Sequence, residues 1–272
     1  MPARIPIRTE LGFSTSDRVV VRGRDLPGEL IGHFTLGNMA FLQLTGRTPS
    51  TGEAAVFDAL AITLVEHGPT PSALAARLTF LGAPEAMQAA VGAGLCGLGS
   101  VLVGSTEGAA EMLLAALPRE VLSAAPRGED ALRALAERVV AERRARGIAV
   151  PGVGHPIHKP VDPRAAPLFA LARQHGLAGD YIRLIELVSE QASLAYARPL
   201  PVNATGAIAA IACEMGFTPK MCHGIVVFAR AIGLVGHLLE EERSPIAREL
   251  WRRAEDESRE LSLAAEASPR RG

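Results

Sequence analysis

Apolar side chains recur every three or four residues along most of the chain, which is the period of an amphipathic helix. Val56, Leu60 and Leu64 show this spacing in an early segment, and Leu132 and Val139 show it in a charged one. Together with the Gly, Pro and Ser residues that interrupt it, the spacing predicts helices over residues 26–45, 51–66, 73–81, 84–97, 107–117, 127–146, 165–176, 180–197, 204–216, 218–241 and 244–266.

One segment near the N-terminus departs from this period. Residues 18–22 hold three consecutive valines between arginines, and Gly23 follows them. This pattern is typical of a strand that ends in a tight turn. We therefore expect an all-α fold with a short N-terminal β-hairpin.

Residues 150–164, VPGVGHPIHKPVDPR, interrupt the helical pattern with four prolines and two glycines. A loop of this length inside a helical protein is usually functional. Gly152 and Gly154 permit a close backbone approach. His155 can titrate near neutral pH, and Arg164 adds positive charge. The residues alone leave two interpretations open: an anion-binding loop with a candidate acid or base, or a proline-rich turn with a structural role.

The charges of the chain nearly cancel, because 28 Lys and Arg face 29 Asp and Glu, for a net charge of −1. This balance excludes the broad positive surface of a nucleic-acid-binding protein, so an anionic ligand must be held by a local cluster of charge.

Cys96, Cys213 and Cys222 lack the spacing of zinc ligands, and we expect buried free thiols and no metal. The N-terminus has no apolar leader, and the longest apolar runs are interrupted before the length that a membrane span needs. We expect a cytoplasmic protein with no membrane and no nucleic-acid partner.

The loop also resembles the P-G-x-G-H…D-P-R signature of the citrate synthase superfamily. The signature falls on Pro151–His155 and Asp162–Arg164. Three other segments are similar to motifs of the family and follow in the same order: Arg22–Leu26, Glu66–Gly68 and Phe228–His237. The short chain resembles the citryl-CoA lyase-like subgroup.

The resemblance implies the citrate synthase fold and a homodimer. A large helical domain would comprise residues 1–104 and 201–272, and a smaller inserted helical domain would comprise residues 105–200 with the loop.

The resemblance also implies which residues bind the substrate. The carboxylates and hydroxyl of a di- or tricarboxylate should be surrounded by His67, His155, Arg164 and Arg230. Arg243 resembles an arginine that the lyase branch contributes across the dimer. The adenine of coenzyme A should be wrapped by the backbone of Val150, Pro151, Gly152, Val153 and Gly154.

The chain departs from citrate synthases at two catalytic positions. Leu102 stands where the family motif L-H-G-G-A-N-E has its enol-stabilising histidine, and Thr205 stands where N-V-D has its catalytic aspartate. Of the three central catalytic side chains, His155 remains. Threonine cannot directly replace a carboxylic acid, but its hydroxyl could position a water or donate a hydrogen bond to the thioester oxygen.

The leading functional hypothesis from the resemblance is a citryl-CoA lyase-like enzyme that splits citryl-CoA, or a related 3-hydroxyacyl-CoA, into acetyl-CoA and oxaloacetate. His155 would assist this retro-aldol step at the hydroxyl or at the carbonyl that forms from it. Two alternatives stay open: a citrate synthase-like acyltransferase that condenses an acyl-CoA with a 2-oxo acid, and a CoA-ester-binding protein with impaired catalysis. The CoA thioester would be substrate or product, with no permanently bound cofactor.

Overall fold

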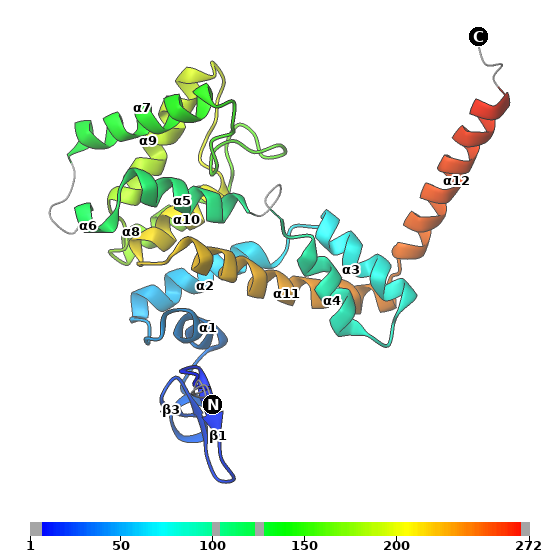
Figure 1. Ribbon diagram of the computed structural model, residues 1–272, viewed down its shortest axis with the longest axis horizontal. Coiled ribbons are helices and arrows are strands. Elements are labelled where there is room, and N and C mark those ends of the chain that lie inside the picture. Colours follow the sequence, from blue (N-terminus) through cyan, green and yellow to red (C-terminus); the bar gives the residue numbers. More distant parts are fainter. Residues whose placement is uncertain (1–6, 100–103, 123–127, 268–272) are drawn as a thin grey trace, which may run out of the picture. The chain divides into compact units, whose positions relative to one another are not determined.

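Helices dominate the computed structural model, which describes residues 7–99, 104–122 and 128–267 (Figure 1). They are α1 (Leu36–Thr45), α2 (Thr51–Val65), α3 (Pro71–Gly82), α4 (Met87–Cys96), α5 (Ser105–Ala116), α6 (Arg119–Leu122), α7 (Glu129–Ala145), α8 (Ala165–Gln174), α9 (Asp180–Ala195), α10 (Ala204–Glu214), α11 (Pro219–Arg243) and α12 (Ala247–Ala267). The predicted all-α class is confirmed. The short α6 is the one helix among these that the apolar spacing did not predict.

The N-terminal segment forms a small antiparallel sheet that extends the expected hairpin by a strand. Its strands are β1 (Gly12–Ser14), β2 (Val19–Val21) and β3 (Arg24–Asp25), paired in the order β1-β2-β3. The tight turn between β2 and β3 lies at Arg22 and Gly23, where both residues have positive φ.

The expectation of one continuous helix over residues 26–45 is wrong. The structure has a short π-helical turn, η1 (Leu26–Leu30), and then a separate helix, α1. Gly32 has a φ of +80°, a left-handed conformation that ends regular helix. Thr35 then caps α1, because its side chain accepts a hydrogen bond from the N–H of Asn38.

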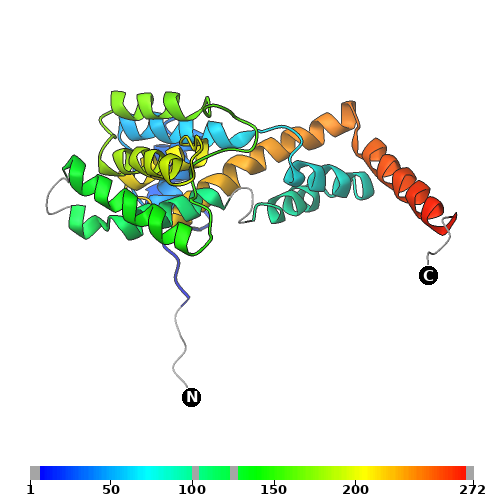
Figure 2. The same ribbon diagram turned by 90° about the horizontal axis from the view of Figure 1, so that it is seen from above.

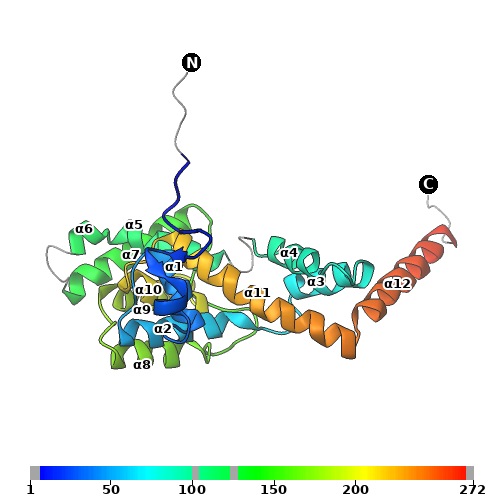
Figure 3. The ribbon, with the colours of Figure 1, turned by 90° about the horizontal axis from the view of Figure 1, so that it is seen from below.

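The chain forms two compact units, and the first comprises Met1–Thr63 and Ser105–Gly224. Its central helix is α10, an almost fully buried run of small and branched residues that contacts α5, α8 and α9 (Figure 3). Side chains as small as alanine let the neighbouring helices approach α10 closely. Phe41, Phe57 and Phe217 form an aromatic cluster in the same unit, with ring centroids 5.4–5.9 Å apart.

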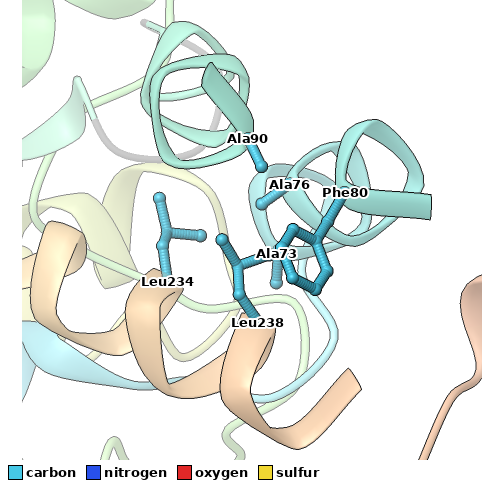
Figure 4. Close-up of a cluster of buried hydrophobic side chains, with 6 residues drawn as sticks. All are labelled: Ala73, Ala76, Phe80, Ala90, Leu234 and Leu238. Carbon is cyan, nitrogen blue, oxygen red and sulfur yellow. The ribbon is translucent and has the colours of Figure 1, made fainter. Parts of the chain in front are cut away.

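The second unit comprises Leu64–Gly104 and Ile225–Gly272. Helices α3 and α4 lie side by side in it (Figures 1 and 2). Their contact with the second half of α11 buries the cluster Ala73, Ala76, Phe80, Ala90, Leu234 and Leu238 (Figure 4). Helix α3 begins earlier than predicted, at Pro71, with Thr70 as its cap, because proline suits the first position of a helix.

Helix α11 is long and apolar enough, by length and composition, to cross a membrane. It carries the buried charged side chain Arg230, and its Leu234 and Leu238 are fully buried against α3 and α4. Such packing is typical of a core helix. The expected division into domains 1–104 with 201–272 and 105–200 stays a prediction.

Candidate active site

Backbone hydrogen bonds hold the 150–164 loop against the start of α10. The N–H of Gly154 donates to the carbonyl of Pro201 at 2.7 Å, and the N–H of Asn203 donates to the carbonyl of Gly152 at 3.0 Å. The loop is therefore anchored directly beside the first turn of α10.

Glycine is required at the closest point of this contact. Gly152 has a φ of +87°, and a β-carbon built on it would lie 2.8 Å from the α-carbon of Gly206. Any larger residue would separate the loop from α10. The predicted CoA-binding segment, residues 150–154, thus lies against the turn that carries Thr205.

A cavity of about 250 Å³ opens beside this segment in the first unit. Val150 and Val153 line it together with Arg144, Tyr196 and Arg198. The guanidinium of Arg144 lies over the Tyr196 ring, 6.0 Å from its centroid. An aromatic ring with two arginines suits a nucleotide with its phosphates. The arginines were not among the residues that the motifs identified, because neither belongs to the signature.

Asp162 and Arg164 form a bidentate ion pair at the end of the loop. Nε of Arg164 donates to Oδ1 of Asp162 at 2.9 Å, and Nη2 donates to Oδ2 at 2.8 Å. Oδ2 also accepts from the backbone N–H of Ala204 at 2.9 Å. Burial raises the pKa of Asp162, but Arg164 and the backbone donors outweigh it and lower that pKa to about 2. The Arg164 guanidinium, predicted to bind substrate, is therefore already engaged with Asp162.

This ion pair predicts an acid-sensitive contribution to stability. Asp162 has a pKa below its ordinary value of 3.8 in the folded chain, so its stabilisation is complete above about pH 4 and is lost as the pH falls toward 2. We expect Asp162→Asn to lower the free energy of unfolding by about 2 kcal/mol at pH 7, and by much less near pH 2.5. Urea unfolding at the two pH values measures this, with the exposed Asp256→Asn as the control. An equal loss at both pH values would contradict it.

His155 is oriented by the backbone that follows it. Its Nδ1 accepts hydrogen bonds from the N–H groups of Ile157, at 3.1 Å, and His158, at 3.0 Å. The imidazole rings of His155 and His158 stack, with their centroids 4.4 Å apart. Because Nδ1 is an acceptor, these partners assign the proton of the neutral ring to Nε2. His155 therefore acts as a donor at Nε2.

Thr205 lies in the first turn of α10 and takes part in a chain of hydroxyl hydrogen bonds. Its Oγ1 donates to Oδ1 of Asn203 at 2.7 Å and accepts from Oγ of Ser105 at 3.1 Å. The amide of Asn203 is itself fixed, because Nδ2 donates to the carbonyl of Gly154 at 2.6 Å. The proton of Thr205 is thus committed to Asn203, and its oxygen offers a lone pair. This arrangement suits the holding of a water better than donation to a thioester oxygen.

The second unit contains two more of the predicted residues, His67 and Arg230. Arg230 is only 7% exposed, and its Nε and Nη1 are buried without a hydrogen-bond partner among the described residues. Burial lowers the pKa of Arg230, while the Glu66 carboxylate opposes this change. The backbone N–H of His67 donates to the same carboxylate at 2.9 Å. Unpaired guanidinium donors in a buried position are suited to a ligand carboxylate.

For the remaining predicted residues, the structure gives a location or an exposure. Arg243 is the last residue of α11 and is exposed, and its role across a dimer stays a prediction. Leu102 lies outside the described residues. Cys213 and Cys222 are buried free thiols, and burial raises the pKa of Cys222 to about 12, whereas Cys96 is exposed, contrary to expectation.

Sequence reasoning missed the partners of the predicted residues. Asn203 stands first in the segment that aligns with N-V-D, but neither it nor Ser105 was predicted to hold the Thr205 hydroxyl. One signal for a buried polar contact in the second unit was available: Arg77 is an arginine in a helix of alanine and leucine, where it requires a buried partner, and that partner is His237.

The profile of the citrate synthase C-terminal domain matches residues 35–253. Citryl-CoA lyase from Hydrogenobacter thermophilus is 30% identical, with 86% of each chain covered and a TM-score of 0.75. No curated protein matched the sequence.

Two further structures share the fold at lower identity. A mutant ATP citrate lyase from Methanosaeta concilii, in complex with (3S)-citryl-CoA, is 20% identical, with a TM-score of 0.72; 89% of this chain covers 40% of that one. Citrate synthase from Thermotoga maritima is 19% identical, with a TM-score of 0.59; 76% of this chain covers 53% of that one.

Proposed function

Because the chain belongs to the citrate synthase family, we propose that it is a citryl-CoA lyase-like enzyme, which cleaves citryl-CoA or a close relative to acetyl-CoA and oxaloacetate. The observation that carries the proposal is the anchored loop, which holds His155 as a donor at Nε2 beside the turn that bears Thr205. The likeness to a citryl-CoA lyase over 86% of both chains supports the lyase direction.

Cleavage requires the tertiary hydroxyl of citryl-CoA to lose its proton. The bond between the carbinol carbon and the CH₂ of the thioester arm then breaks, and the electron pair passes to the thioester as an enolate. The enolate carbon takes up a proton to give acetyl-CoA. His155 would donate from Nε2 to the hydroxyl oxygen, which stabilises negative charge on it before the bond breaks. A water held by the oxygens of Thr205 and Ser105 would accept the proton of the hydroxyl and return it to the enolate carbon, so that no proton is gained or lost overall.

Binding of the substrate is assigned to two sets of residues. The carboxylates would be bound by His67 and Arg230. Arg164 would join them when its guanidinium is released from the ion pair with Asp162. Coenzyme A would lie along residues 150–154, with its nucleotide in the cavity lined by Arg144 and Arg198. The cytoplasmic location, the homodimer with Arg243 at its interface, and the lack of a permanent cofactor are part of the same proposal.

A second candidate function is binding of CoA esters without turnover. One observation favours it: the Thr205 hydroxyl donates its proton to Asn203. Position 205 therefore has neither a carboxylic acid nor a hydroxyl proton directed at an enolate. The condensing direction, from an acyl-CoA and a 2-oxo acid, would use the same residues in reverse.

Assays of two reactions and one binding measurement separate these functions. The purified protein is incubated with citryl-CoA, and oxaloacetate is followed by its reduction with NADH and malate dehydrogenase. Citryl-CoA formed from acetyl-CoA and oxaloacetate, or free thiol released when that thioester is hydrolysed, reports condensation, and calorimetry with coenzyme A and with citryl-CoA reports binding. We expect oxaloacetate from citryl-CoA. Tight binding of citryl-CoA without products would contradict the lyase proposal and support the binding function.

A further inference from the structure

A cluster of charged side chains lies buried in the second unit. Arg77 on α3 is 2% exposed, and His237 and Glu241 on α11 are 9% and 6% exposed. Nη1 of Arg77 donates to Glu241 at 2.7 Å, and Nη2 also contacts the carboxylate of Glu240. Burial of several charged groups is unfavourable unless each one is paired. The donor and acceptor of each hydrogen bond in the cluster therefore indicate which group the cluster holds in place.

The hydrogen bonds of His237 have a fixed direction. Nε of Arg77 donates to Nδ1 of His237 at 3.1 Å, and Nη2 lies 2.9 Å from the same nitrogen. An arginine can only donate, so Nδ1 accepts and the proton of the neutral ring is on Nε2. Nε2 lies 3.1 Å and 3.0 Å from the two carboxylate oxygens of Glu66 and donates to them. The order of donation is Arg77 to His237 to Glu66.

Glu66 continues this order into the residues assigned to carboxylate binding. Its Oε1 accepts from the backbone N–H of His67 at 2.9 Å and of Gly68 at 2.5 Å. The glycine at position 233 lets the backbone before Glu66 lie against α11, since a β-carbon there would lie 2.0 Å from the carbonyl oxygen of Val65 and 3.1 Å from Oε2 of Glu66. Arg230 is one helical turn before Gly233 on the same helix, and its buried guanidinium interacts electrostatically with Glu66.

We propose that Glu66 is a positioning residue: held by His237, which Arg77 holds in turn, its carboxylate fixes the backbone of His67 against the helix that carries the buried guanidinium of Arg230, so that both are oriented for a carboxylate ligand. This inference rests on the proposed function, in which His67 and Arg230 bind the carboxylates of citryl-CoA. Glu66 acts through these two residues and does not contact the reacting atoms.

Through Glu241, Arg77 also supports the start of α12. Oε1 of Glu241 accepts from the N–H groups of Ile246 and Ala247, at 2.9 Å and 2.8 Å, at the start of α12. Loss of Arg77 would therefore disturb α12 as well as Glu66. Glu66 has a 47% exposed side chain, so its replacement leaves the buried core intact.

The test compares the binding of citrate and of coenzyme A, each alone, to the full chain by calorimetry. Glu66→Ala removes the acceptor, and we expect it to weaken citrate binding about 10-fold. Glu66→Gln keeps an oxygen that accepts from His67 and Gly68, and it should bind citrate within about 3-fold of the wild type. Coenzyme A binding should stay within about 2-fold in both variants. Glu240→Gln, which alters the partly exposed partner of Arg77, is the control.

A pair of His237 variants tests the support for Glu66. His237→Gln retains an acceptor for Arg77 and a donor for Glu66, and should recover citrate binding that His237→Leu loses. A purely structural role would lower the melting temperature of His237→Leu without changing citrate affinity, and Glu66→Ala would then bind citrate like the wild type; either result overturns the proposal. Failure of the wild type to bind citrate and coenzyme A would instead overturn the proposed function and, with it, this inference.

Discussion

Replacement of His155 by alanine should lower kcat for citryl-CoA cleavage by a factor of about 10²–10⁴, the range that a positioned proton donor or acceptor contributes. The structure gives the reason. Nδ1 accepts from the N–H groups of Ile157 and His158, so the proton of the neutral ring is on Nε2, the atom that would donate to the hydroxyl oxygen of the substrate. Alanine removes this donor while the backbone of the loop remains. The rate of oxaloacetate formation under single-turnover conditions measures the loss.

The matched control is His175→Ala, the same change at the end of α8 in the same unit. Its kcat should stay within about 2-fold of the wild type. Coenzyme A binding should also stay within about 3-fold in His155→Ala, because residues 150–154 are held to α10 by backbone hydrogen bonds and by the fit of Gly152 against Gly206. An unchanged kcat in His155→Ala would show that the chemistry is carried elsewhere.

The helices could be predicted from the sequence because local signals agree with one another. At the start of α2, Oγ of Ser50 accepts from the N–H of Glu53 while the Glu53 carboxylate accepts from the N–H of Ser50, a reciprocal cap between residues three apart. The break at Gly32 was missed because the apolar residues on both sides of it keep a helical spacing. A pattern of apolar positions does not show that one residue has a positive φ. Thr70 was missed as a cap because Ser72 offers the same chemistry two positions later.

The site could be located from the sequence, but its hydrogen bonds could not. The spacing of His155 and Arg164 within one signature identifies the loop. The contacts that determine what these residues can do join distant positions: the carboxylate of Asp162 receives the N–H of Ala204, 42 residues later, and Arg77 meets His237, 160 residues later. No local pattern encodes such pairs. The direction of the Thr205 hydrogen bond depends in turn on the amide orientation of Asn203, which the carbonyl of Gly154 determines.

Replacement of Thr205 by aspartate should raise kcat for citryl-CoA cleavage by a factor of at least about 10, since an acid at this position can protonate the enolate carbon directly. The turn can accept the new carboxylate. It lies at the N-terminus of α10, where the helix dipole favours negative charge, and Oγ of Ser105 can donate to it. The same two features favour the ionised form of the new aspartate, so the gain should be largest at acidic pH and should decline as the pH rises through its pKa.

Thr205→Asn is the control for this change, because asparagine has nearly the shape of aspartate but no acidic proton. It should be no faster than the wild type in the same oxaloacetate assay at any pH. Equal gains in the two variants would assign the effect to a rearrangement of Asn203 or Ser105 and not to proton transfer. A Thr205→Asp enzyme slower than the wild type would show instead that the hydroxyl chain Ser105–Thr205–Asn203 is the working arrangement of this site, with its water as the proton source, and that the aspartate of the family is incompatible with it.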